Sequence, residues 1–140
     1  MKPAFLNECL FFTTNRLGRA ITKLAEEEFA ETGLSPTYGY LLRLAIESPG
    51  ATQKTLAEEL AVAPSTLTRF VDKLEAKRLV ERKVQGKTVL VYPTEKGMRL
   101  HEPLREASKR FRARYEALLG KSVADGLAAT MNETSAKLDS

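Results

Sequence analysis

Two short apolar stretches joined by a tight turn constrain the fold of this chain more than any other feature. Their apolar residues recur at helical spacing; these are Leu56, Ala57 and Leu60 before the turn, and Leu67, Val71 and Leu74 after it. Pro64 stands at the start of the second stretch, where a proline favours the first turn of a helix. Because the connection is short and Ala57 is small, the two helices can cross closely. The pattern predicts a helix-turn-helix whose second helix can lie in a DNA groove.

Capping and breaking residues divide the preceding part of the chain. Residues 5–31 carry an apolar stripe that predicts one long helix, and Gly33 supplies its stop. Ser35 followed by Pro36 predicts the start of a second helix, because serine is a favoured N-cap and proline suits the first helical position. Thr52 is expected to cap the first helix of the helix-turn-helix.

The following part of the chain predicts a hairpin and two more helices. Residues 79–83 and 88–92 are β-rich runs around Gln85-Gly86. Helical spacing returns after residue 94, and Pro103 is expected to kink or restart that helix. A last helix is expected to begin at Ser122, with Asp125 completing a capping box.

The order of elements predicts a mainly α fold with a small β-hairpin. We expect a winged helix-turn-helix DNA-binding domain over residues 35–97, flanked by dimerisation helices at 1–34 and 98–140. The terminal helices have apolar stripes with little left inside one subunit to cover them, which favours a two-fold homodimer. A monomeric six-helix bundle remains the alternative.

Composition limits the classes of function. Cys9 is the single cysteine, which excludes an internal disulfide and a multi-thiolate metal site within one subunit. No apolar run approaches the roughly 20 residues of a membrane span, and the N-terminus lacks a signal peptide's apolar stretch. His101-Glu102 lacks the second histidine of a zinc helix motif. We expect a cytoplasmic protein without membrane partner, metal or cofactor, and, because phosphate loops and nucleophile elbows are missing, no enzyme.

The second helix of the helix-turn-helix presents a polar face suited to DNA. Arg69 is its early forked donor, for which a bidentate contact to guanine is the natural use, and Lys73 is placed to meet a phosphate. Backbone N–H groups at the helix starts offer further phosphate contacts. The predicted DNA-binding residues are Gln53, Lys54, Ser65, Thr66, Thr68, Arg69, Lys73, Arg82, Lys83, Lys87 and Thr88.

Charge supports this interpretation only weakly. The formal net charge is +4, from 22 basic and 18 acidic residues. A winged-helix module that binds a protein partner instead of DNA therefore stays open as an alternative.

The run from Ser65 to Glu75, with Leu79-Val-Glu-Arg and Thr94-Glu-Lys-Gly, resembles the MarR family of multiple-antibiotic-resistance-type regulators. The resemblance extends over essentially the whole chain. It implies an obligate dimer with a winged-helix fold, transcriptional repression at a palindromic operator, and release by a small ligand or an oxidant. It also implies that Lys87 corresponds to a wing-tip arginine that enters the minor groove, although this wing is about three residues shorter and Gly86 replaces an acidic residue.

Two candidate sensing sites follow from the same resemblance. A small-molecule effector would bind between the first, second and long helices, in a pocket lined by Phe12, Arg16, Tyr40, Arg43 and His101. Alternatively, these aromatic residues belong to the core and the arginines to the surface. Cys9 lies near the reactive thiol of the organic-hydroperoxide sensors, but alignment on Arg19 and Lys23 places that thiol at Phe11, and an inert apolar role for Cys9 is the alternative.

Overall fold

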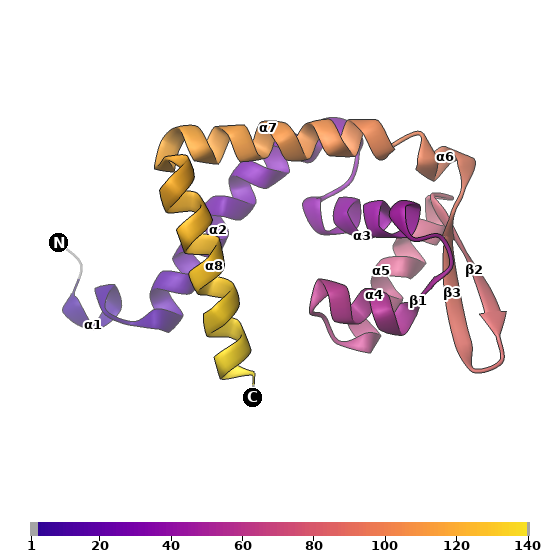
Figure 1. Cartoon of the computed structure of the whole chain (residues 1–140), viewed down its shortest axis with the longest axis horizontal. Helices are drawn as coiled ribbons and strands as arrows, with labels where there is room; N and C mark the ends of the chain where they lie inside the picture. Colours follow the sequence, from indigo (N-terminus) through magenta and orange to yellow (C-terminus); the bar gives the residue numbers. More distant parts are fainter. Residues whose placement is uncertain (1–2, 140) are drawn as a thin grey trace.

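A long helix, α7 (His101–Leu119), runs along the molecule and joins a helical arm to a lobe of helices and strands (Figure 1). The arm contains α1, α2 and α8, and the lobe contains α3 to α6 with a small sheet. This description comes from a computed structural model and covers residues 3–139. The mainly α fold with a β-hairpin wing is confirmed.

The N-terminal segment forms two helices and not the single helix predicted over residues 5–31. Helix α1 (Ala4–Asn7) ends at Glu8, and α2 (Leu10–Phe29) begins after Cys9, whose backbone is extended. A short 3-10 helix, η1 (Ala30–Thr32), follows α2 and ends at Gly33. Gly33 has a φ of 77°, the left-handed conformation that a glycine adopts without strain.

Three helices of the lobe follow the sequence signals closely. Helices α3 (Pro36–Glu47) and α5 (Pro64–Ala76) both begin at a proline. Helix α4 (Gln53–Leu60) is capped by Thr52, whose Oγ1 accepts a hydrogen bond of 3.0 Å from the backbone N–H of Thr55. The predicted helix-turn-helix is therefore confirmed as α4 and α5.

The wing is a three-stranded antiparallel sheet in the order β1-β3-β2. Strands β2 (Val80–Gln85) and β3 (Thr88–Pro93) form the hairpin, and β1 (Ala51–Thr52) adds a short strand that was not predicted. Gln85 pairs with Thr88, so the turn consists of Gly86 and Lys87 and lies one residue beyond the expected position.

Two helices follow α6 (Glu95–Met98) and return the chain to the arm. Pro103 is the third residue of α7, where its missing N–H costs no helical hydrogen bond, so the break comes before it, at residues 99–100. Helix α8 (Lys121–Leu138) has no side-chain cap. Asp125 does not complete a capping box, because its carboxylate accepts a 2.6 Å hydrogen bond from Lys121 Nζ.

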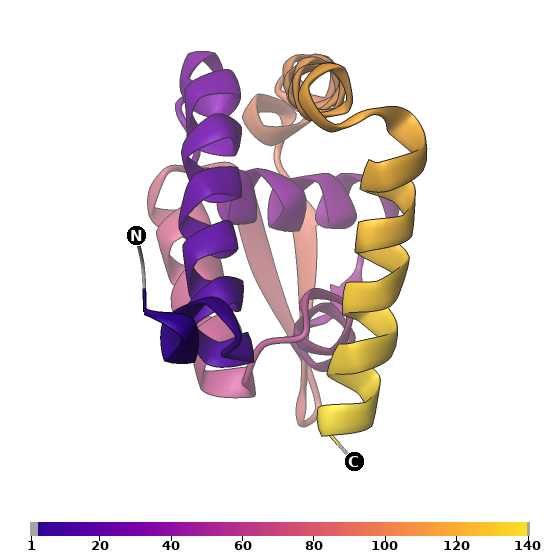
Figure 2. The same cartoon turned by 90° about the vertical axis from the view of Figure 1, so that its left-hand side faces the viewer.

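The core fills the lobe and continues beneath α7. It is built mainly of leucine, valine and alanine side chains from α3, α4, α5 and the sheet, with Phe29 from α2 and Leu104 from α7. On the arm, Glu28 of α2 pairs with Arg110 and Arg114 of α7. In a view along the axis of α7, helices α2 and α8 lie on opposite sides of the arm as two separate columns (Figure 2).

Candidate nucleic-acid interface

The start of α5 presents a polar face to solvent. Ser65, Thr68 and Arg69 are exposed and Thr66 is half-buried, whereas the opposite face of the helix is fully buried in the core. Within the described residues the Arg69 side chain makes no hydrogen bond or ion pair. The helix therefore holds a free guanidinium at the position where a base contact was predicted.

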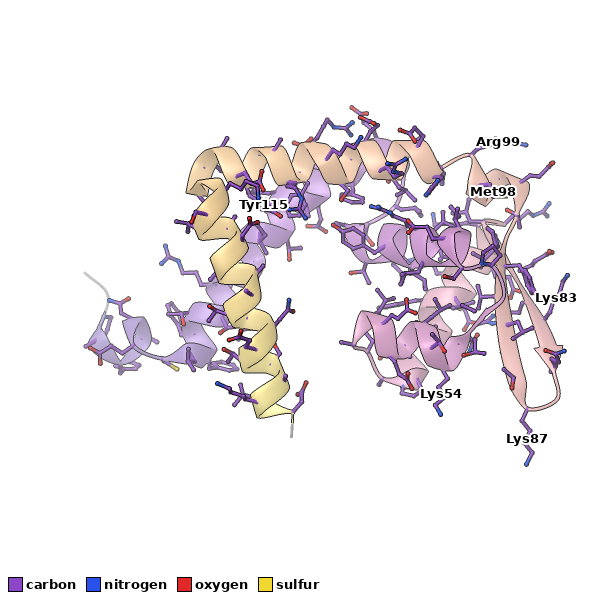
Figure 3. The ribbon with its side chains drawn as sticks, viewed as in Figure 1. Lys54, Lys83, Lys87, Met98, Arg99 and Tyr115 are labelled. Atoms are coloured by element: carbon purple, nitrogen blue, oxygen red, sulfur yellow. The ribbon has the colours of Figure 1, made fainter. Side chains whose placement is uncertain are left out.

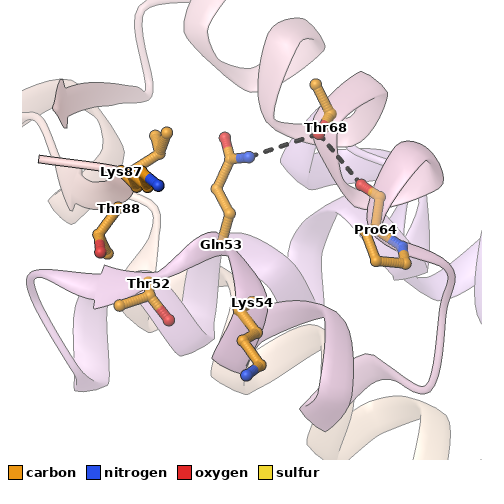
Figure 4. A pocket seen from close by; sticks show the side chains of 8 residues that line it. Thr52, Gln53, Lys54, Pro64, Thr68, Lys87 and Thr88 are labelled. Atoms are coloured by element: carbon orange, nitrogen blue, oxygen red, sulfur yellow. Dashed lines mark hydrogen bonds between the residues drawn. The ribbon is translucent and has the colours of Figure 1, made fainter.

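Side chains from three elements surround a hollow of about 500 Å³ next to this face (Figure 4). Its lining comes from the start of α4, the start of α5 and the tip of the wing, and consists of Thr52, Gln53, Lys54, Pro64, Thr68, Lys87, Thr88 and Val89. Gln53 Nε2 donates to Thr68 Oγ1 at 3.4 Å, and that hydroxyl donates to the carbonyl of Pro64 at 3.0 Å. The fold thus gathers several of the predicted residues around one concave surface.

Lys54 and Lys87 extend from this side of the lobe into solvent (Figure 3). Both are exposed, and neither forms an ion pair within residues 3–139. Lys73, exposed near the end of α5, lies one helical turn beyond Arg69, and its Nζ is 5.7 Å from the ring centroid of Tyr38 on α3. A surface with hydroxyls at its centre and cations at its edges suits a phosphate backbone.

Arg82 lies differently from the other predicted contacts. Its guanidinium forms ion pairs with Asp72 at 2.7 Å and Glu75 at 3.0 Å, and donates to Gln53 Oε1 at 2.7 Å. It also donates to the carbonyl of Thr68 at 2.9 Å, and its side chain is only 19% exposed. These contacts link the wing to both α4 and α5 and engage Nε, Nη1 and Nη2 of the guanidinium, whereas a direct contact of Arg82 with DNA stays a prediction.

Lys83 lies apart from the hollow. Side chains alternate across a strand. Arg82 points toward α4 and α5, as its contacts show, and the next side chain, Lys83, points outward from the hairpin (Figure 3). The Lys83 Nζ lies 4.7 Å from the ring centroid of Tyr92, a cation–π arrangement.

The residues of the predicted effector pocket lie in more than one place. Arg43 Nε donates to Glu47 Oε2 at 2.7 Å, and His101 Nε2 lies 3.7 Å from the same oxygen. The hydrogen bond from Arg43, with a smaller contribution from His101, lowers the pKa of the Glu47 carboxyl. This cluster connects α3 of the lobe to the start of α7.

The aromatic members of that set are separated. Tyr40 packs edge-on against Phe29 with ring centroids 5.4 Å apart, and burial raises the pKa of its hydroxyl. Phe12 and Arg16 belong to the first half of α2, where Arg16 lines a different hollow together with other α2 residues. The structure therefore does not gather the five residues into the single cavity expected from the sequence.

Cys9 is a half-buried residue between α1 and α2. Within the described part of the chain its sulfur has no hydrogen-bond partner, and a reactive thiolate needs a cationic or hydrogen-bonding neighbour. The redox alternative therefore gains no support from the geometry. Among residues 3–139 no group of three potential metal ligands occurs, and none of the described helices is long and apolar enough to cross a membrane.

Comparison with known proteins gives the same fold and points to one family. A family model described as the MarR family matches residues 34–84. The uncharacterized HTH-type transcriptional regulator YybA of Bacillus subtilis (strain 168) is 32% identical over 93 residues, which is 64% of this chain. The chain spans 61% of the length of that curated relative.

Solved structures extend the likeness to the arm. CouR from Rhodococcus jostii RHA1, bound to p-coumaroyl-CoA, is 25% identical with a TM-score of 0.78, and the alignment covers 94% of this chain and 95% of that one. CouR bound to a 23-mer DNA duplex is 23% identical with a TM-score of 0.81, covering 96% and 98% of the two chains. The matched family model, the regulator relative and the shared fold agree with one another: the chain is similar to MarR-family regulators and has their fold.

Proposed function

We propose that the protein is a transcription regulator that binds double-stranded DNA in a sequence-dependent manner. The observation that carries the proposal is the exposed face of α5, with Arg69 unpaired beside the hydroxyls of Ser65 and Thr68. Lys54 and Lys87 flank this face from α4 and from the wing. A helix with this polar face has the chemistry needed to read base edges in a major groove.

Each group on this surface has a distinct role in the proposal. Arg69 reads a base, with guanine as the partner that best fits its forked donors. Lys54 and Lys73 contact phosphates, and the free backbone N–H groups at the start of α4 add a phosphate site. Lys87, with Thr88 beside it, reaches the neighbouring minor groove from the wing tip.

We further propose that the protein acts as a homodimer formed through the arm. A groove of about 240 Å³ lies between α2, α7 and α8, with an apolar lining that includes Ile21, Phe111 and Leu127. At the other end of the arm, Phe5, Leu10 and Phe11 are each more than two-thirds exposed. The N-terminal segment of a second copy has the apolar side chains to cover this groove, and a two-fold pair would do so twice.

The mode of action is proposed from the relatives. CouR is described as a transcriptional repressor and has been solved with p-coumaroyl-CoA and with duplex DNA. We infer that this chain is likewise a repressor acting at a palindromic operator, and that a small-molecule effector changes its affinity for DNA. In a two-fold complex the half-sites would lie one helical turn apart, about 34–36 Å.

Selection of bound duplexes from a random pool, with the purified full-length chain, tests the proposal. The expected product is an inverted repeat whose half-sites are about one turn apart. Light scattering on the same sample should give a dimer, and Leu127→Glu should shift it to a monomer that binds duplexes more weakly. Met98→Glu is the matched control, because Met98 is exposed on α6 and far from the groove. Failure to enrich any duplex would favour the alternative, a winged-helix module that binds a protein partner.

A further inference from the structure

A second hollow lies where the arm joins the lobe. It has a volume of about 350 Å³, within the range of small-molecule sites. Its lining comes from the end of η1, the end of α5 and the α6–α7 connection, and consists of Thr32, Gly33, Leu34, Lys77, Leu79, Lys96, Arg99 and Leu100. In Figure 3 Arg99 lies at the opposite end of the lobe from Lys54 and Lys87. We call this site the junction hollow.

Both covalent connections between arm and lobe pass along the junction hollow. The chain leaves α2 and η1 through residues 32–34 and enters α3, and it returns from α6 to α7 through residues 99–100. A third wall is the turn between α5 and the wing, which contains Lys77 and Leu79. A molecule bound here would touch every backbone segment that sets the position of the lobe on the arm.

The rim of the junction hollow is positively charged and uncompensated. Lys77, Lys96 and Arg99 all line it, and within residues 3–139 no carboxylate oxygen lies within 4.0 Å of their side-chain nitrogens. Lys96 Nζ donates instead to the backbone carbonyl of Lys77, at 3.1 Å. Two acidic residues directly adjoin lining residues in the sequence: Glu95 has no ion pair among the residues that the structure describes, and Glu31 pairs with Arg110 at 3.7 Å. Three cations around one hollow repel one another unless an anion joins them.

The turn that brings Lys77 and Leu79 to the junction hollow contains a strained residue, Arg78. Arg78 has a φ of 62° at the end of α5, where its N–H donates to the carbonyl of Glu75 and the N–H of Leu79 donates to that of Leu74. This hydrogen-bond pattern closes a helix most easily with glycine. The backbone between the lining residues Lys77 and Leu79 is therefore strained, and such strain tends to persist where it serves a function.

The floor of the junction hollow is aliphatic. Leu34 and Leu79 are buried and Leu100 is half-buried, and all three contribute to the lining. An apolar floor beneath a cationic rim suits a molecule that has a carboxylate or phosphate group and a short apolar portion. None of the residues predicted for the effector pocket, such as Tyr40 or Arg43, belongs to this lining.

We propose that the junction hollow binds a small amphiphilic anion, with Lys96 and Arg99 holding its charged group and the three leucines its apolar part. Binding would fix the two connections and change the orientation of the lobe on the arm. This second step rests on the proposed function, since its consequence is a change in DNA affinity; the binding step does not depend on it.

Four small probes separate the contribution of charge from that of hydrophobicity. Hexanoate and hexyl phosphate have both an anionic group and an apolar chain, inorganic phosphate has only the charge, and 1-hexanol has only the apolar chain with a neutral hydroxyl. Binding to the full-length chain is followed through the methyl resonances of Leu34 and Leu100. We expect hexanoate or hexyl phosphate to bind, with the stronger of the two identifying the charged group, and 1-hexanol to bind far more weakly. Equal binding of 1-hexanol, or no binding of either anion, would overturn the proposal.

Variants locate the site. Arg99→Gln should weaken the better anion about tenfold or more, because a charge-assisted hydrogen bond is lost. Within residues 3–139 the Arg99 side chain makes no hydrogen bond or ion pair, and only its backbone N–H donates, to the carbonyl of Glu95 at 3.1 Å, so this variant should fold normally. Lys109→Gln, on the exposed side of α7, removes the same charge elsewhere and should leave anion affinity unchanged. Equal loss in the two variants would contradict the site.

Duplex affinity measured with and without the better anion tests the coupling. If the anion changes the duplex affinity of the wild-type chain but not that of Arg99→Gln, the coupling is supported. If the duplex affinity of the wild-type chain is unchanged at saturating anion, the coupling is refuted. If the chain binds no duplex but Arg99→Gln still weakens anion binding as expected, the proposed function fails and the anion site stands.

Discussion

Nη2 of Arg82 on β2 lies 2.7 Å from Oδ1 of Asp72 on α5. The same guanidinium reaches Glu75 one turn further along α5, and Gln53 at the start of α4. A single wing residue thus connects the sheet to both helices of the helix-turn-helix. It also neutralises two carboxylates that would otherwise stand on the helix proposed to enter the DNA groove.

Arg82→Ala should therefore weaken duplex binding without removing a direct contact. We expect a loss of about 1–3 kcal/mol in stability, because its partners lose hydrogen bonds to a charged group. Hydrogen exchange should rise in β2 and β3, and fluorescence anisotropy should show lower affinity for every duplex. In an Asp72→Ala background the same change should cost less affinity, whereas a fully additive double variant would argue against the pairing.

Arg69→Ala tests base reading. We expect a loss of roughly 1–3 kcal/mol on the selected operator and a relaxed preference at one base pair in each half-site. Binding to operator variants at that pair provides the measurement. Lys83→Ala is the control, because that side chain lies over Tyr92 on the outer side of the hairpin. An equal loss on all duplexes would remove Arg69 from the base-reading role.

Lys87→Ala tests the wing tip. The variant should lose affinity to a similar extent on specific and unrelated duplexes, and the slope of log affinity against log salt should fall by about one per subunit. Titrations at several salt concentrations measure both quantities. An unchanged slope would mean that the wing tip does not contact the backbone.

Arg78→Gly should stabilise the chain, because glycine adopts a φ of 62° without the steric cost that arginine carries. The expected gain in the free energy of unfolding is about 0.5–1 kcal/mol, measured by urea denaturation. Lys77→Gly, at a helical φ of −82°, should instead destabilise the chain by a similar amount. The opposite order of the two variants would show that Arg78 makes a compensating contact.

The Glu47 cluster predicts a pH effect with a defined sign. The Arg43 hydrogen bond lowers the pKa of Glu47 in the folded chain, so its contribution to stability is present above the unfolded-state pKa and lost as pH falls through the folded-state pKa. Arg43→Gln should raise the pKa of Glu47, as followed by its side-chain carboxyl carbon resonance. His101→Gln should raise it less, because Arg43 is the larger cause. An equal or larger rise of the Glu47 pKa in His101→Gln would contradict Arg43 as the larger cause.

Capping and proline signals in the sequence were sufficient to predict most helices of the lobe. Pro36, Pro64 and the Thr52 cap define helix starts by their own chemistry, and α3, α4 and α5 begin where these residues indicate. The gap between α1 and α2 carries no such signal, since Asn7-Glu8-Cys9 includes neither glycine nor proline. Strand β1 has two residues, too few for an alternating pattern, and exists because Ala51 and Thr52 pair with Val91 and Leu90 of β3.

The candidate interface was predictable at α5 and less so at the wing. Apolar residues at helical spacing determine which face of α5 is exposed, so Ser65 and Arg69 follow directly from the sequence. The inward role of Arg82 depends on its distance to Asp72 and Gln53, which are 10 and 29 positions away along the chain. From its charge alone, Arg82 was predicted to contact DNA in the same way as Lys83 and Lys87. The junction hollow likewise combines residues from three separate segments, which no local pattern brings together.

The two-residue turn at Gly86 and Lys87 limits how the wing can adapt. Gln85 and Thr88 are already paired, and the paired strands continue back to Val80 and Pro93, so the tip has no slack chain with which to stretch. The reach from Arg69 to Lys87 is then nearly a fixed length, held at its base by Arg82. In a DNA complex this fixed separation would make binding depend on the shape of the duplex. Duplexes whose minor groove is too wide or displaced would bind weakly, even where every base that Arg69 reads is correct.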